Sequence, residues 1–290
     1  MNSPIFIIGN PRSGTTLLRL MLTCHKNILI PPECGFAVWW YVKYKDWGEQ
    51  GFDEHLLFEF IQDLMQSRKI ETWGINPEEL FKFIEERRPS SYSGLVSSVY
   101  DWYGLSQGKK FVRWGDKNNF YIDHIDTIKA IFPEAFFIHI VRDGRDVACS
   151  YKKLSEQKVD SPYTPNLPRE IEEIARQWKN NVRRAMKSFS KIGWENVYEL
   201  KFENLVIDTK DTLQKLCHQL GEEYDPSVLR YHALNMEHEL EPKEFLKWKG
   251  KTLKEPILDE VGRYSRELTS HELSVFYKVA GEVLSKYGYS

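Results

Sequence analysis

The chain has 290 residues, 41% of them hydrophobic, and carries 40 Lys and Arg against 42 Asp and Glu, for a net charge of -2 at pH 7. This length supports one substantial core, and we expect a single domain over residues 1–290 rather than two domains. The near-neutral balance, without a long block of like charge, argues against a nucleic-acid partner and a polybasic membrane patch. Any anion site must therefore be built from local features.

Cysteine usage and the N-terminal apolar stretch exclude further classes. None of the four cysteines forms a CxxC pair or has the spacing of a zinc ligand; they are Cys24, Cys34, Cys149 and Cys217. We expect no disulfide framework, no metal site and reduced thiols, as in the cytoplasm. Apolar residues 5–22 are interrupted by Pro11, Arg12 and Gly14, so we expect no signal peptide and no integral membrane segment.

The first predicted elements are a strand, a loop and a helix. Residues 4–9 (PIFIIG) form a short apolar run that stops at a glycine, as in a buried parallel strand. Residues 15–25 place leucines and a methionine on a broad helical face. Residues 27–30 predict a second short strand, which Pro31 and Pro32 end.

Helices and strands alternate along the rest of the chain. Amphipathic periodicity predicts helices at residues 53–69, 77–87, 93–105, 120–132, 169–191, 209–220 and 270–287, and one that begins near Asp143. Apolar runs predict strands at residues 135–141 and 197–202. Residues 236–256 are charged and non-periodic, which favours a surface lid or insertion. Strands separated by helices predict an α/β fold, a P-loop-type parallel β-sheet flanked by helices on both faces, with helical insertions.

The loop after the first strand is typical of an anion-binding loop. Gly9-Asn-Pro-Arg-Ser-Gly14-Thr15-Thr16 has the G-x-x-x-x-G spacing of a P-loop, followed by hydroxyl residues. Backbone N–H groups and the positive end of the following helix form a phosphate cradle in such loops. The residues expected to bind are Pro11, Arg12, Ser13, Gly14, Thr15 and Thr16. The alternative is an ordinary strand-to-helix turn capped by Ser13.

The loop departs from a nucleotide triphosphatase at one position. Thr15 stands where those proteins have a lysine that contacts the β and γ phosphates beside Mg²⁺. Its absence argues against ATP. A phosphosulfate is less charged, because its sulfuryl group carries one negative charge, so Arg12 and a helix end can suffice without a metal.

Two motifs resemble one known family. PRSGTTLLR at residues 11–19 resembles the 5′-phosphosulfate loop of the sulfotransferases, especially the bacterial and protein-tyrosine branches. FIHIVRDGRDVACSY at residues 137–151 resembles their 3′-phosphate motif, with Arg142 at a strand end and Ser150 eight residues later. The resemblance implies 3′-phosphoadenosine 5′-phosphosulfate (PAPS) as donor, with its 3′-phosphate on Arg142 and Ser150. Taken alone, Arg142 and its charged neighbours also fit a solvated cluster at a helix start.

Two later segments are similar to the family over shorter strings. YELKFENLV at residues 198–206 is similar to a strand-to-loop pattern of the sulfotransferases. Gly262-Arg263-Tyr264 is similar to an element that closes over the donor, which implies donor binding by Arg263. The fuller RxGxxGDWK motif of the cytosolic branch is absent.

Glu33 is the predicted general base. It lies 21 residues after Arg12, a placement similar to the catalytic glutamate of the tyrosine-sulfating branch; the alternative is an ordinary loop carboxylate. Since a free glutamate titrates near ~4.3, burial among nearby aromatic residues would have to raise its pKa. Lys117, in WGDKNN, resembles the lysine of the GDKxP element, with Asn119 in place of the proline. Lys117 and Arg12 are expected to stabilise developing charge.

Two aromatic features leave alternatives open. Trp178 can stack on the donor adenine or, as we favour, pack in the core. Six aromatic residues after Glu33 can line an acceptor pocket or pack a helix. They are Phe36, Trp39, Trp40, Tyr41, Tyr44 and Trp47.

These features together predict a metal-independent, cytoplasmic sulfotransferase. It would transfer a sulfuryl group from PAPS to a hydroxyl or amine of a small-molecule, glycan, lipid or peptide acceptor. One alternative is a P-loop kinase that uses Mg-ATP, with Asp143 as the metal-binding acid. The other is a non-catalytic nucleotide-binding module.

Overall fold

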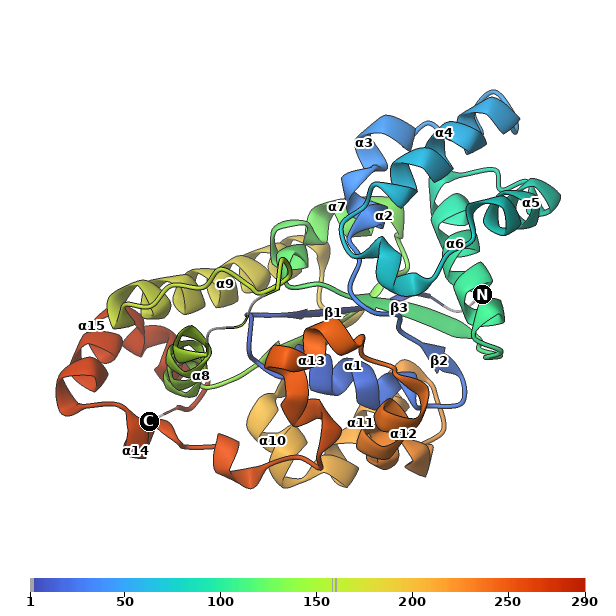
Figure 1. The fold of residues 1–290 in the computed structure, drawn as a ribbon. Coiled ribbons are helices and arrows are strands. Elements are labelled where there is room, and N and C mark those ends of the chain that lie inside the picture. Colours follow the sequence, from blue (N-terminus) through green and yellow to red (C-terminus); the bar gives the residue numbers. More distant parts are fainter. Residues whose placement is uncertain (1–2, 158, 160, 290) are drawn as a thin grey trace.

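The computed structural model describes residues 3–157, 159 and 161–289, and its centre is a five-stranded parallel sheet. The strand order is β2-β3-β1-β4-β5, and helices cover both faces of the sheet (Figure 1). The strands are β1 (Ile5–Gly9), β2 (Ile28–Leu29), β3 (Arg113–Lys117), β4 (Phe136–Val141) and β5 (Val197–Lys201). The predicted α/β architecture with a parallel sheet is confirmed.

The longer helices lie where the sequence periodicity predicts them, whereas several short helices were not predicted, and residues 120–132, predicted as one helix, contain a 3-10 helix followed by a shorter α-helix. The α-helices are α1 (Thr15–Thr23), α2 (Phe36–Trp39), α3 (Tyr41–Tyr44), α4 (Glu54–Met65), α5 (Pro77–Arg87), α6 (Tyr92–Ser106), α7 (Ile125–Ile131), α8 (Gly144–Glu156), α9 (Ile171–Ile192), α10 (Phe202–Ile207), α11 (Thr209–Leu220), α12 (Tyr231–His238), α13 (Lys243–Lys249), α14 (Tyr264–Glu267) and α15 (Ser270–Lys286). The described residues also form short 3-10 helices: η1 (Ile70–Trp73), η2 (Asn119–Asp123), η3 (Pro226–Arg230), η4 (Gly250–Leu253) and η5 (Leu258–Glu260). Among the described residues, no helix is both long and apolar enough to cross a membrane.

Local capping explains why several helices begin where they do. The Asp53 side chain accepts hydrogen bonds from the first N–H groups of α4, and Asn76 does the same for α5. Thr269 and Glu272 form a capping box at the start of α15. Each cap satisfies N–H groups that have no partner within the helix, so these starts are encoded locally.

Strand β1 divides its side chains between two cores, because successive residues of a strand point to opposite faces. Phe6 and Ile8 pack with side chains of α4, α5, α6 and α7 on one face. Ile5 and Ile7 pack with α1, α10 and α11 on the other face. All four side chains are fully buried, as expected for a parallel sheet covered by helices on both faces.

The strand order gathers three strand ends at one edge of the sheet. Strand β1 lies between β3 and β4, with Ile7 paired to Lys117 and Gly9 paired to Ile140. The segments that leave the carboxyl ends of these strands therefore start side by side. Open α/β sheets bind ligands at this edge.

Strand β3 and residues 236–256 also differ from what the sequence predicts. Strand β3 was not predicted, because Arg113–Lys117 (RWGDK) is rich in polar and charged residues although all five residues are buried. Residues 236–256 contain α13 and η4, and Phe245 and Trp248 of α13 are buried beside Leu154. The description of this segment as non-periodic surface was therefore wrong for α13.

Candidate functional site

The loop between β1 and α1 is a tight turn in which two residues have left-handed backbone. Arg12 has φ +67° and Gly14 has φ +91°. A Cβ atom on Gly14 would lie 2.4 Å from Cδ2 of Phe202, so a side chain fits here neither by conformation nor by space. Helix α1 begins at Thr15, so the positive end of its dipole lies beside the loop.

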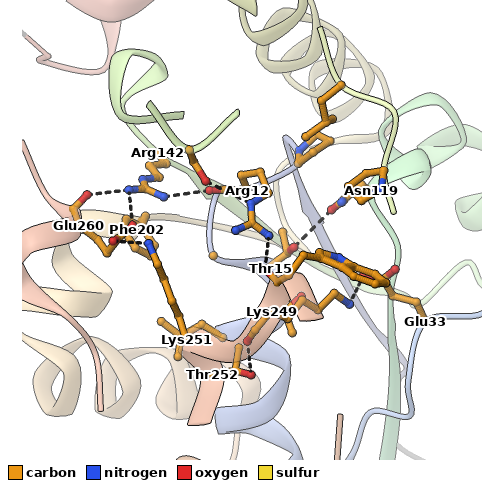
Figure 2. A pocket seen from close by; sticks show the side chains of 18 of the residues that line it. Arg12, Thr15, Glu33, Asn119, Arg142, Phe202, Lys249, Lys251, Thr252 and Glu260 are labelled. Carbon is orange, nitrogen blue, oxygen red and sulfur yellow. Dashed lines mark hydrogen bonds and ion pairs between the residues drawn. The ribbon is translucent and has the colours of Figure 1, made fainter. Parts of the chain in front are cut away.

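A cavity of about 480 Å³ lies over this loop. Its wall includes most of the residues predicted to bind the donor: Pro11, Arg12, Gly14, Thr15, Thr16, Arg142 and Ser150. Glu33, the predicted base, lines the same cavity. Figure 2 shows the Arg12, Arg142 and Glu33 side chains around it. Residues widely separated in the sequence therefore meet at the sheet edge.

Arg12 connects the loop to two other parts of the cavity wall. Its Nε atom donates to Ser150 Oγ at 3.1 Å, and its Nη1 atom donates to the Trp248 carbonyl oxygen at 3.2 Å. Desolvation, followed by repulsion from Arg142, lowers the pKa of Arg12 to about 10. The guanidinium remains charged at neutral pH, and an anion in the cavity would relieve the repulsion.

Arg142 directly follows β4 and points across the loop. Its Nη1 atom donates to the Arg12 carbonyl oxygen at 3.0 Å, and its guanidinium lies 4.3 Å from the centre of the Phe202 ring. The Nε atom is buried without a hydrogen-bond partner among the described residues. Because buried donors are nearly always satisfied, this atom fits a phosphate ligand that the chain itself does not supply.

Ser13 and Arg263 lie outside the cavity wall. Ser13 is fully buried, and its Oγ atom has no partner in the part of the chain that the structure describes. Arg263 donates to Glu267 at 2.8 and 2.7 Å and to Glu260 at 3.1 Å. Glu260 in turn contacts Arg142, so Arg263 reaches the cavity through that carboxylate.

Glu33 is buried and surrounded by ammonium groups. Its Oε1 atom contacts Lys117 and lies 3.2 Å from Lys249, while Oε2 contacts Lys69. Lys117 also donates to Thr16 Oγ1 at 3.2 Å, which joins the predicted base to the loop. The predicted proximity of Glu33, Lys117 and the loop is present, but lysines rather than aromatic residues contact the carboxylate.

Lys69 and Lys249 were missed by the sequence analysis. Burial, followed by repulsion from Lys249, lowers the pKa of Lys117 well below its ordinary value. The same two causes lower the pKa of Lys69 to about 7. Lys69 and Lys249 both lie in polar segments without a motif, and only the tertiary structure brings them to Glu33.

The aromatic residues of both alternatives lie outside the cavity wall. Trp178 is buried, its Nε1 atom donates to the Arg142 carbonyl oxygen at 3.0 Å, and its ring packs near Phe276. It therefore supports the end of β4 from the core and does not line the cavity. None of the six aromatic residues after Glu33 lines the cavity either; Trp39, for example, stacks on Phe120 with ring centres 5.5 Å apart.

Comparison with known proteins decides the family. The model of the "Sulfotransferase family" matches residues 4–226. The chain belongs to the sulfotransferase family. This membership confirms the predicted resemblance, and no finding here favours the kinase alternative.

Relatives and solved structures agree with this family. The protein-tyrosine sulfotransferase A of Caenorhabditis elegans is 21% identical over 237 residues, which cover 79% of this chain and 53% of that protein. This sulfotransferase chain thus spans about half the length of the nematode relative. A second relative is the omega-hydroxy-beta-dihydromenaquinone-9 sulfotransferase Stf3 of Mycobacterium bovis. It is 22% identical, and the match covers 99% of this chain and 75% of the Stf3 chain. The sulfotransferase domain of the Synechococcus PCC 7002 olefin synthase shares the fold, with a TM-score of 0.61, 19% identity and coverage of 96% and 95%.

Proposed function

We propose that this protein is a sulfotransferase that uses PAPS as donor and a hydroxyl or amine as acceptor. The observation that carries the proposal is one cavity wall that includes the phosphate loop, Arg142 with Ser150, and Glu33. Family membership supports the reaction class. A mouse sulfotransferase of the same fold, with a TM-score of 0.50 and 14% identity, was solved with adenosine 3′,5′-bisphosphate (PAP), the product that PAPS would leave.

The negatively charged ends of the donor are held by hydrogen-bond donors and cationic side chains of the cavity wall. The loop N–H groups and Arg12 bind the 5′ end, while Arg142 and Ser150 bind the 3′-phosphate, which ATP lacks. We predict no metal requirement, because Arg12, Lys117 and Lys249 supply the positive charge that Mg²⁺ provides in kinases.

PAPS supplies the sulfuryl group when it is bound. A bond forms between the acceptor oxygen or nitrogen and sulfur as the bond from sulfur to the bridging oxygen breaks, and the electron pair leaves on the 5′-phosphate of PAP. Glu33 takes the acceptor proton, and Lys117, which contacts both Glu33 and Thr16, stabilises charge on the bridging oxygen.

The segment at residues 236–256 acts in this proposal as a lid. The Trp248 carbonyl accepts from Arg12 and Lys249 contacts Glu33, so the segment touches both the donor loop and the base. It belongs to a single domain with the sheet.

The acceptor class stays broad. Relatives are named for protein tyrosine, 3-alpha-hydroxysteroid and a hydroxylated menaquinone. We therefore propose a small-molecule, glycan, lipid or peptide acceptor, and we retain the predictions of a cytoplasmic location and no nucleic-acid partner.

Calorimetry and turnover test the proposal. PAP should bind without Mg²⁺, and ATP with Mg²⁺ should bind much more weakly. Transfer from sulfate-labelled PAPS, screened over these acceptor classes, should fall by roughly 10²- to 10⁴-fold in Glu33→Gln while PAP affinity holds. Glu134→Gln, an exposed carboxylate, is the matched control. Absence of PAP binding would overturn the proposed function, whereas unchanged transfer in Glu33→Gln would remove only the base assignment.

A further inference from the structure

Lys69 has a backbone conformation that long side chains rarely adopt. It lies in the turn between α4 and η1 with φ +74°. Within the described residues, the other non-glycine residues with positive φ are Arg12, Arg88 and Glu239. Arg88 and Glu239 are C-terminal caps of α5 and α12, where left-handed backbone is common. Arg12 and Lys69 are not C-terminal caps, and both line the cavity. Backbone strain is often retained at functional sites.

The turn that carries Lys69 is held firmly in place. The Thr72 hydroxyl and N–H group donate to the Lys69 carbonyl oxygen at 2.8 and 3.0 Å. The Trp73 Nε1 atom donates to the Pro32 carbonyl oxygen at 3.0 Å, which ties η1 to the residue before Glu33. The backbone at Lys69 is therefore held in place relative to the segment that carries Glu33.

The two oxygens of Glu33 have different surroundings. Oε1 contacts Lys117 and Lys249, whereas Oε2 contacts Lys69. The Lys69 side chain is 15% exposed and the Lys249 side chain 9% exposed, and both line the cavity, whereas Lys117 is 1% exposed and does not. Oε2 therefore contacts the most exposed of the three lysines, while Oε1 is shared between the two less exposed ones. An acceptor hydroxyl within hydrogen-bonding distance of Oε2 must lie beside Lys69 Nζ.

We propose that Lys69 is a further catalytic residue, whose ammonium stabilises the negative charge that develops on the acceptor oxygen as Glu33 takes its proton. This inference rests on the proposed function. The acceptor proton goes to Glu33 Oε2, the acceptor oxygen bonds to sulfur, and Lys69 keeps its own proton throughout. A fixed cation at a developing oxyanion is a strong form of transition-state stabilisation. Lys69 thus serves the acceptor, whereas Lys117 is joined to the donor loop through Thr16.

Several charged groups face the Lys69 ammonium. Glu33 contacts it, and Lys249, Arg68 and Glu241 act on it from neighbouring elements. Burial and then the charge of Lys249 lower the pKa of Lys69 to about 7. Transfer should therefore decline as the pH rises above this range and Lys69 loses its proton. An arginine at this position stays charged, so Lys69→Arg should move the decline to higher pH.

Three substitutions separate the role of the charge from that of the backbone. Lys69→Met removes the ammonium at similar length, Lys69→Gly also relieves the left-handed backbone, and Lys69→Arg keeps the charge. Arg88→Gly is the matched control, because Arg88 is an exposed cation with φ +45° outside the cavity wall. The measurements are PAP affinity by calorimetry, the thermal unfolding midpoint, and PAPS hydrolysis, in which water replaces the unidentified acceptor.

The rate of hydrolysis should fall at least about 10-fold in Lys69→Met and Lys69→Gly, and most of it should return in Lys69→Arg. In Lys69→Arg the decline of the rate at alkaline pH should begin at a higher pH than in the wild type. PAP affinity should stay within about 2-fold in all variants, and the unfolding midpoint of Lys69→Gly should not drop. If wild type and Lys69→Met hydrolyse PAPS at the same rate, the role of Lys69 is overturned. This includes the case in which both rates equal the rate without enzyme. Loss of activity that tracks a lower unfolding midpoint, without recovery in Lys69→Arg, overturns it as well. Absence of PAP binding to the wild type instead refutes the proposed function.

Discussion

Arg142 is paired with both the main chain and the side chain of Glu260. Its Nη2 atom donates to the Glu260 carbonyl oxygen at 2.6 Å and lies 3.5 Å from Oε2 of the same residue (Figure 2). Lys251 and Arg263 also contact this carboxylate. Although burial acts in the opposite direction, these cations lower the pKa of Glu260 to about 2. A phosphate that binds Arg142 must therefore compete with a permanently charged carboxylate.

Replacing this competitor should strengthen product binding. In Glu260→Gln the charge is lost but the carbonyl contact can persist, so we expect PAP affinity to rise roughly 3- to 10-fold. Adenosine 5′-monophosphate, which lacks the 3′-phosphate, should change little. Calorimetry with both nucleotides checks this, with Glu255→Gln as a second carboxylate of the cavity wall for control. Weaker PAP binding in Glu260→Gln would mean that Glu260 positions Arg142 rather than competing for it.

Removing the arginine should have the opposite and selective effect. Arg142→Ala should weaken PAP by about 10- to 150-fold, the equivalent of ~1.5–3 kcal/mol for hydrogen bonds to a charged group. Adenosine 5′-monophosphate should bind almost as before, since the loop at Arg12, which lines the same cavity, is the part proposed to hold the 5′ end. Parallel titrations of the two nucleotides measure the selectivity, and equal losses for both would show that Arg142 only supports the loop.

The meeting of the proposed donor-binding residues at one cavity could be predicted because the signals are local. The phosphate loop combines a strand end, two glycines and a helix start within a few residues, and Arg142 and Ser150 likewise lie where β4 ends and α8 follows. Glu33 also follows a strand, β2, so parallel order alone brings these groups to one edge of the sheet.

The rest of the cavity could not be predicted because its signals are tertiary. Strand β3 lacks an apolar pattern, since buried Asp116 is satisfied by the hydroxyls of Tyr100 from α6 and Tyr121 from η2. Lys69 and Lys249 belong to segments that look like ordinary polar surface in the sequence. The Trp248 contact with Arg12 uses a backbone carbonyl, which leaves no signature in the side chains.

Gly14→Ala tests whether the loop conformation itself binds the anion. A Cβ atom at this position meets the Phe202 ring, and the φ of +91° disfavours any side chain, so we expect PAP affinity to fall at least about 10-fold and stability to drop. Gly221→Ala is matched, because Gly221 has φ +70° with nothing within 4 Å of its Cβ position. It should lose ~1 kcal/mol of stability without a change in PAP affinity. Calorimetry and urea unfolding separate the two effects, and PAP affinity that survives in Gly14→Ala would contradict the cradle.

Glu241 should make the stability of the protein sensitive to acid. It is 2% exposed and contacts Arg19 at 2.5 Å and Lys249 at 2.6 Å. Burial alone would raise its pKa, but Lys249, Arg19 and Lys117 lower the pKa of Glu241 from 4.5 to about 2. The unfolded chain therefore binds this proton more readily than the folded chain. The stabilisation is complete above about pH 4.5 and is lost as the pH falls toward 2.

The substitution Glu241→Gln should remove that dependence. At pH 7 the free energy of unfolding should decrease by roughly 3 to 5 kcal/mol, because Arg19 and Lys249 lose their buried counter-charge. Between about pH 4.5 and pH 2 the wild type should lose stability more steeply than the variant. Urea unfolding at a series of pH values measures both, with Glu134→Gln as the exposed control. Parallel pH curves for wild type and Glu241→Gln would show that other carboxylates, rather than the one that anchors Lys249 beside Glu33, govern acid unfolding.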